Sequence, residues 1–186
     1  SFDTTNQFTH NGGEVKQFRP EAFIDRAKLP YLSRASQMAV AAAKLAMGDA
    51  KLDSAGIKAS NTAVCIGTNI GSVQSVEIID EIMVRGKTHD IDHRLFAQIP
   101  TNTTAAAVAR EFDIQGPCAM FSTACAAGNY AIGYGYDLIR LQKADMVLAG
   151  GSDAFSKVAF TGFNQFKAVA PEKCQPFDKN RRGMMV

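Results

Sequence analysis

The chain has 186 residues, of which 46% are hydrophobic and 20% are charged, and its formal net charge at pH 7 is +2. This length and composition are typical of a folded domain with a hydrophobic core of its own. So small a net charge gives no reason to expect a nucleic-acid or membrane partner, and no apolar run is long enough to span a bilayer.

The first part of the chain is predicted to hold an irregular segment, two helices and one strand. Residues 1–32 are polar and interrupted by turn signals, which predicts loops. A helix is predicted over residues 33–52, where a serine provides the N-cap. Thr62–Thr68 is short, apolar and β-branched, as in a buried strand, and Ser72–Arg85 follows as a helix ended by Gly86.

The middle of the chain alternates two further strands with helices. Residues 87–102 show no clear pattern, whereas Thr103–Phe112 predicts a short helix. Cys118–Thr123 and Ala144–Gly150 are predicted as buried strands on either side of a helix over Ala126–Gln142. Strands that are apolar throughout and alternate with helices predict an α/β layered fold.

The end of the chain is predicted to hold a helix over Ala159–Ala170 and then a polar loop around Pro176–Asp178. The apolar run Met184–Val186 resembles the start of another strand. A sheet of roughly three or four strands that starts and stops in mid-pattern would leave unpaired edges. The 186 residues are therefore interpreted as one partial domain, truncated at both ends, of a larger protein.

The four cysteines indicate free thiols rather than disulfide bonds. None has CxxC spacing and no signal peptide opens the chain, so a reducing cytoplasm is the simplest location. Cys65 and Cys118 lie in the apolar strand-like runs, where a cysteine is typically a small buried hydrophobe. Cys174 lies in a polar loop.

Cys125 lies where the predicted strand Cys118–Thr123 turns into the helix over Ala126–Gln142. A thiol at the start of a helix faces unpaired backbone N–H groups and the positive end of the helix dipole, and both favour the thiolate. The same N–H groups can stabilise the oxyanion of an attacked thioester. The helix is also rich in alanine and glycine, so an inert cysteine in a tightly packed helix is the alternative interpretation.

Four segments in this order resemble motifs of the β-ketoacyl-acyl carrier protein synthases, most closely the type II elongating enzymes and type II polyketide ketosynthases. They are Gly116–Asn129 around Cys125, Ala144–Asp153, Gly162–Phe163 and Pro176–Gly183. The resemblance covers nearly the whole chain, from about residue 25 to its end. It implies a thiolase-like αβαβα layered sandwich, of which the chain represents largely the N-terminal half.

The resemblance implies the activity of a 3-oxoacyl-acyl carrier protein synthase in fatty acid or polyketide biosynthesis. That reaction is a decarboxylative Claisen condensation of an enzyme-bound acyl thioester with malonyl-acyl carrier protein. Cys125 is implied to be the covalent nucleophile, with its own backbone N–H as one oxyanion donor. The family needs neither a metal nor another cofactor.

The resemblance also assigns other positions. Ile70 matches a residue lining the acyl-chain pocket and Phe163 a gating aromatic beside the nucleophile, although simple core packing would explain both. Arg26, Lys28 and Lys167 match basic positions that dock the acidic carrier protein, although exposed Lys and Arg are often only solvated charges. The implied partner is therefore an acyl carrier protein with phosphopantetheine-linked substrates.

Residues 94–103 resemble a segment at the family's homodimer interface, so a second copy of the chain is also expected as a partner. The family's two catalytic histidines would follow the last matched motif, whereas His10, His89 and His93 all precede Cys125. His89 and His93 have a metal-like spacing, but a solvated face is favoured because no further ligands cluster nearby. The 186 residues alone are therefore expected to be acylated at most.

Three alternatives stay open. Another thiolase-like acyltransferase would share Cys125 but not the loop context of Pro176–Asp178. A non-catalytic chain-length-factor partner subunit has the same fold but lacks the nucleophilic cysteine. The third alternative is a carrier-binding or dimerisation module with no activity of its own.

Overall fold

The computed structural model describes residues 2–52, 56–57 and 60–186. The chain forms two compact units, which we describe each by itself. The larger unit is Arg19–Asp153, and the smaller unit combines Ser1–Phe18 with Ala154–Val186. No helix in the described ranges is both long and apolar enough to cross a membrane.

The larger unit is built on a three-stranded parallel sheet with the strand order β2-β1-β3. Its strands are β1 (Thr62–Gly67), β2 (Cys118–Phe121) and β3 (Met146–Gly151), which confirms the positions of the three predicted strands. The prediction that all three are buried is confirmed for β1 and wrong for β2 and β3, whose residues are partly or fully exposed because these are the outer strands of the described sheet. β1 is the central strand and is buried at every residue, as its uninterrupted apolar sequence requires. β2 ends two residues earlier than predicted, at Phe121, and Ser122 and Thr123 connect it to the next element.

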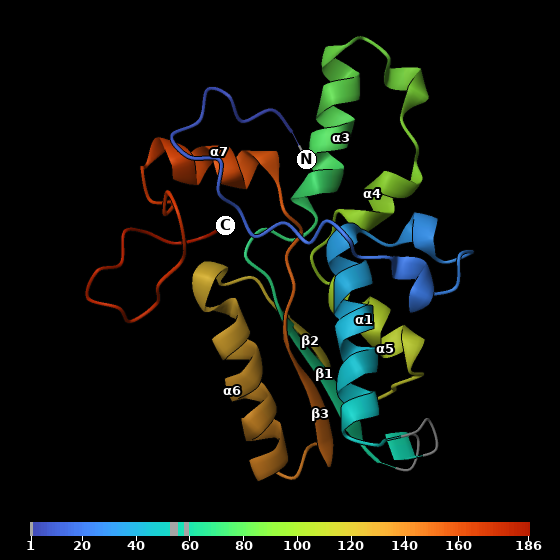
Figure 1. Cartoon of the computed structure of the whole chain (residues 1–186). Coiled ribbons are helices and arrows are strands. Elements are labelled where there is room, and N and C mark those ends of the chain that lie inside the picture. Colours follow the sequence, from blue (N-terminus) through green and yellow to red (C-terminus); the bar gives the residue numbers. More distant parts are fainter. Residues whose placement is uncertain (1, 53–55, 58–59) are drawn as a thin grey trace. The chain divides into compact units, whose positions relative to one another are not determined.

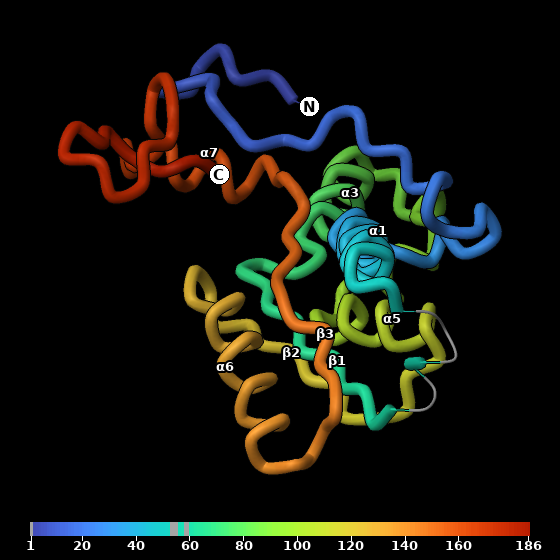
Figure 2. Tube along the Cα trace, turned by 60° about the horizontal axis from the view of Figure 1, so that its bottom comes forward, coloured from blue at the N-terminus to red at the C-terminus, as the bar shows by residue number. Residues whose placement is uncertain are grey.

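Helices cover both faces of this sheet, as Figures 1 and 2 show. On one face, α1 (Arg34–Asp49) packs against α5 (Thr103–Glu111), and α5 contacts β1 and β2. On the other face, α6 (Ala127–Arg140) contacts all three strands. The unit is therefore an α/β layered structure, as the alternation of strands and helices predicts.

The side chains of β1 alternate between two cores, one on each face of the sheet. Val64 and Ile66 belong to the core beneath α1 and α5. Ala63 and Cys65 belong to the core beneath α6. Small side chains on the α6 side let that helix lie close to the sheet.

α1 begins as its sequence predicts. The Ser33 hydroxyl caps the helix by accepting a hydrogen bond from the Ser36 backbone N–H at 3.2 Å. The buried Ser36 hydroxyl also bonds the Thr104 hydroxyl at 3.1 Å, which ties the start of α1 to α5. Two short 3-10 turns precede the helix, η1 (Pro20–Ala22) and η2 (Leu29–Tyr31), in the segment predicted as loops.

Between β1 and α5 lie α3 (Val73–Val84), the 3-10 turn η3 (Thr88–Asp90) and the short helix α4 (Arg94–Gln98). α3 confirms the predicted second helix. Residues 87–102, which show no clear sequence pattern, make both local and long-range polar contacts. In one of these, the side-chain hydrogen bond from Arg94 lowers the pKa of Asp92 to about 2.

The smaller unit is organised around α7 (Lys157–Gln165). The buried Phe160 ring contacts the rings of Phe2 and Phe155 at centroid distances of 5.5 and 5.6 Å. The buried Asn164 side chain accepts from the Thr9 N–H at 2.9 Å and donates to a helix carbonyl. These contacts hold segments from both ends of the chain against one helix.

Two predictions for the smaller unit need correction. The helix predicted over 159–170 starts two residues earlier, at Lys157, and ends at Gln165. It cannot extend to residue 170, because Lys167 has a positive φ of 53° that no helix continues through. Met184–Val186 does not form a strand among the described residues. Met184 makes only an isolated parallel bridge with Val169.

Candidate active site

Three loops follow the carboxyl ends of the parallel strands at one edge of the sheet. The strands end level, because Gly67 of β1 pairs with Phe121 of β2 and Gly151 of β3. Backbone hydrogen bonds continue beyond the strands, from Thr68 N to Phe121 O at 2.8 Å and from Ser152 N to Gly67 O at 3.1 Å. Ligand sites of open α/β sheets lie outside this carboxyl edge.

Cys125 lies in the loop that follows β2. It is exposed, and it forms part of the 3-10 turn η4 (Ala124–Ala126), which leads directly into α6. Ala124 adopts a φ of 52°, a left-handed conformation that L-residues other than glycine rarely take. This sharp turn places an accessible thiol at the start of a long helix, where none of the described side chains caps the first turn.

Gly67 allows α6 to approach the sheet at this point. A Cβ built on Gly67 would lie 2.4 Å from the carbonyl carbon and oxygen of Ala127 and 2.6 Å from the Gly128 nitrogen. No side chain larger than hydrogen fits against backbone atoms at these distances. The position of the first turn of α6, and therefore of Cys125, depends on this glycine.

Ile70, the predicted pocket-lining residue, lies in the loop that follows β1 and is half-buried. Its backbone N–H donates to the Asp153 carboxylate at 3.2 Å. Asp153 follows β3, so residues after all three strands meet at the same edge of the sheet as Cys125. The role of Ile70 in holding an acyl chain stays a prediction.

The predicted docking residues have unlike surroundings. Arg26 and Lys28 are exposed, but the Lys28 ammonium donates to the Glu111 carboxylate at 2.8 Å. Burial raises the pKa of Glu111, but hydrogen bonds from Lys28 and Lys44 outweigh it and hold that pKa below its ordinary value. Part of the charge of Lys28 is therefore neutralised within the chain.

Phe163 and Lys167 belong to the smaller unit. Phe163 is a half-buried residue of α7, and Lys167 is exposed two residues after the helix ends. Their predicted roles as gate and docking residue stay predictions. Within the described ranges, no cluster of three or more His, Cys, Asp or Glu side chains could hold a metal ion.

The prediction that Cys118 is buried is wrong. Cys118 is exposed, and it lies on β2, which is an outer strand of the sheet in the described part of the chain. Cys65, on the central strand, is fully buried as predicted. Burial, together with the nearby Cys118, raises the pKa of the Cys65 thiol to about 11.

We expect alkylation to distinguish these cysteines. At pH 8 only about one Cys65 thiol in a thousand is ionised, and the side chain is out of solvent contact, so iodoacetamide should leave it unmodified. The exposed Cys118, Cys125 and Cys174 should react in the native protein. Peptide mass spectrometry before and after unfolding in urea would check this, and native modification of Cys65 would contradict it.

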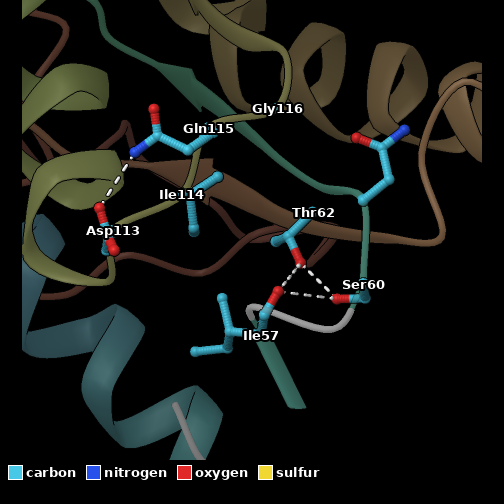
Figure 3. Close-up of a pocket in the computed structure, with 8 residues that line it drawn as sticks. Ile57, Ser60, Thr62, Asp113, Ile114, Gln115 and Gly116 are labelled. Carbon is cyan, nitrogen blue, oxygen red and sulfur yellow. Dashed lines mark hydrogen bonds between the residues drawn. The ribbon is translucent and has the colours of Figure 1, made fainter. Parts of the chain in front are cut away.

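A polar pocket lies at the opposite edge of the sheet, around the amino ends of β1 and β2 (Figure 3). Its polar groups pair with one another. The Ser60 hydroxyl bonds the Thr62 hydroxyl at 2.7 Å, and the Gln115 amide donates to Asp113 at 3.0 Å. The pocket is therefore remote from Cys125 along the strands, and its hydrogen bonds stabilise the strand starts.

Two residues at the carboxyl ends of the strands, near Cys125, were not predicted from the sequence to belong to the site. A glycine at the end of a buried strand is a known sign of close backbone approach, and it could have indicated Gly67. Asp153 gave no comparable signal, because its main partner, Thr68, is 85 residues away in sequence.

The model of the β-ketoacyl synthase N-terminal domain matches residues 3–186. The curated 3-oxoacyl-[acyl-carrier-protein] synthase 2 of Synechocystis sp. is 30% identical over 192 residues, covering 100% of this chain and 46% of that protein. The solved structure of the ishigamide ketosynthase/chain length factor is 34% identical with a TM-score of 0.90, over 99% of this chain and 46% of that chain. A β-ketoacyl synthase structure from Burkholderia phymatum STM815 is 28% identical with a TM-score of 0.80, and the match covers 97% of this chain and 46% of that chain.

The chain thus spans about half the length of the relatives that it matches. Its matched region is the N-terminal domain, and its fold is the corresponding half of a thiolase-like ketosynthase. This agrees with the fold class expected from the ordered motifs.

Proposed function

The chain belongs to the β-ketoacyl synthase family, and we propose that it carries the nucleophile of a condensing enzyme that extends an acyl chain with malonyl-acyl carrier protein. The observation that carries this proposal is the exposed Cys125 in a sharp turn between β2 and α6, at the carboxyl edge of the sheet. The pathway is that of fatty acid or polyketide biosynthesis.

In the first step, the Cys125 thiolate attacks the carbonyl carbon of an acyl thioester. A new sulfur–carbon bond forms, the carrier's thiolate leaves and takes up a proton, and the acyl group stays on Cys125. The backbone N–H of Cys125 would donate to the oxyanion while the carbonyl carbon is tetrahedral. Ile70 and Phe163 are proposed to contact the acyl chain.

In the second step, a malonyl thioester loses CO2, and the resulting carbanion attacks the acyl-Cys125 carbonyl. The product leaves as a 3-oxoacyl thioester, and the cysteine thiolate is regenerated. We assign the acylation step to Cys125 of this chain, and it is therefore the step to measure. The full condensation is proposed for the whole enzyme.

We propose an acyl carrier protein as the partner that delivers both thioesters. Arg26 and Lys167 are exposed cations suited to an acidic surface, whereas Lys28 shares its charge with Glu111. A second protein subunit of the same fold is also proposed, either a copy of this chain or a chain-length-factor type of subunit.

A non-catalytic partner subunit is the alternative function, since one similar solved structure is a ketosynthase/chain length factor. Such a subunit needs no nucleophile. The accessible thiol of Cys125 at the start of α6 favours the catalytic subunit.

We expect Cys125 to be acylated when the protein is incubated with an octanoyl-pantetheine thioester. Intact-protein mass spectrometry would show a single octanoyl addition, and peptide mapping would locate it on Cys125. The Cys125→Ala variant is the matched control and should gain no mass. Acylation of Cys118 or Cys174 in preference to Cys125, or an unmodified wild-type protein, would contradict the proposed function.

A further inference from the structure

We propose that Asp153 is a positioning residue that determines which acyl-chain lengths the site accepts, by holding the loop that carries Ile70. This proposal rests on the proposed function, in which Cys125 is acylated and Ile70 contacts the acyl chain. Asp153 is itself exposed and is the second residue after the end of β3. Its contacts are with Thr68, Asn69 and Ile70 in the neighbouring loop.

The Asp153 carboxylate accepts hydrogen bonds from three consecutive residues. The Thr68 hydroxyl donates to Oδ1 at 2.6 Å, and the Ile70 backbone N–H donates to the same oxygen at 3.2 Å. The Asn69 N–H lies 2.9 Å from Oδ1 and 3.0 Å from Oδ2. Hydrogen bonds to an ionised carboxylate are about twice as strong as neutral ones, so this one side chain fixes two backbone amides of the loop.

Thr68 extends the same network to the far side of the loop. Its side chain is buried, and its hydroxyl accepts from the Gly71 N–H at 2.8 Å while it donates to Asp153. Gly71 has a φ of 61°, and a Cβ there would lie 2.8 Å from the Thr101 methyl carbon. The loop between Thr68 and Gly71 is therefore held at both of its ends.

The anchor that presents Asp153 is also fixed. The preceding residue, Ser152, donates its backbone N–H to Gly67 O at 3.1 Å and its hydroxyl to Ala35 O at 2.8 Å. Asp153 therefore projects from a point tied to both β1 and the start of α1. Because the residue before Asp153 is fixed in this way, the carboxylate can determine the position of the loop.

Without the carboxylate, the backbone N–H groups of Asn69 and Ile70 should donate hydrogen bonds to water instead. The Ile70 side chain would then no longer be held at one position, and the space available to an acyl chain would change. Because no bond joins Asp153 to Cys125 among the described contacts, the intrinsic reactivity of the thiol should stay as it is. The expected signature is altered chain-length preference with an unaltered nucleophile.

The test compares butyryl- and lauroyl-pantetheine as acyl donors to Cys125, with the rate of each acylation followed by intact-protein mass spectrometry. In Asp153→Ala the ratio of the two rates should change by about tenfold, the size of effect that small changes in an apolar pocket produce. Thr68→Val, which removes the hydroxyl but keeps the shape, should shift the ratio in the same direction. Asp153→Asn keeps an acceptor oxygen and should restore most of the wild-type ratio.

Alkylation of Cys125 by iodoacetamide serves as the internal control, and its rate should agree among the variants within about twofold. An unchanged rate ratio in both Asp153→Ala and Thr68→Val would overturn the role of Asp153. A loss of Cys125 alkylation in step with acylation would also overturn it, because that result indicates general disruption. A wild-type protein that accepts neither donor while Cys125 still alkylates would instead contradict the proposed function itself.

Discussion

Replacing Gly67 by alanine is expected to abolish most of the acylation of Cys125. The new methyl carbon would lie 2.4 Å from the backbone of Ala127, and backbone atoms cannot rotate out of its way. Either α6 moves away from the sheet or β1 distorts. Both displace the turn that carries Cys125, and a displacement of about 1 Å at a reacting group can lower a rate by about a hundredfold.

The free energy of unfolding should fall as well, by about 1–3 kcal/mol, the usual cost of an overpacked core. Gly150→Ala is the matched control on the neighbouring strand, because a Cβ there would meet none of the described atoms within 4 Å. Urea unfolding and the acylation rate would be measured on both variants. Wild-type acylation in Gly67→Ala would show that the close approach of α6 does not position the nucleophile.

The elements that the sequence predicted well are those with a strong local signal. β1 is an unbroken apolar β-branched run, and it is a fully buried central strand. α1 starts at Ser33, whose hydroxyl caps the helix as a serine in that position should. Both features follow from a few neighbouring residues, so no knowledge of the rest of the fold is needed.

The features that could not be predicted depend on residues distant in sequence. The apolar run around Cys118 gives no sign that its strand lies at the sheet edge, because strand order depends on pairing between segments that are distant in sequence. The end of α7 is set by the positive φ of Lys167, a conformation that lysine does not signal. Asp153 and Thr68 meet only because β1 and β3 are neighbours in the sheet.

For the candidate site, the local sequence pattern predicted where Cys125 lies, and the family resemblance predicted its role. The predicted turn from strand to helix placed Cys125 at a helix start, which the structure confirms, and the structure adds that the thiol is exposed. The nucleophilic role came from the ordered motifs and stays a proposal until acylation is measured. The sequence also gave no reason to expect the left-handed conformation of Ala124, on which the turn depends.

Replacing Ala124 by valine should therefore remove Cys125 from its position. Ala124 has a φ of 52°, where an L-residue is already strained by about 1–2 kcal/mol. A β-branched side chain is far less tolerated in this region, so the backbone of the valine variant should rotate to an ordinary conformation and open the turn. We expect the acylation rate of Cys125 to fall by about a hundredfold.

Ala124→Gly is the matched control, because glycine adopts a positive φ without strain. It should keep the acylation rate close to that of the wild-type protein. Its free energy of unfolding should change by less than about 1 kcal/mol, because relief of strain offsets the greater freedom of the unfolded chain. Equal acylation rates in the valine and glycine variants would show that the left-handed turn is not what presents the thiol, whereas a large difference would tie the reactivity of Cys125 to the backbone conformation one residue before it.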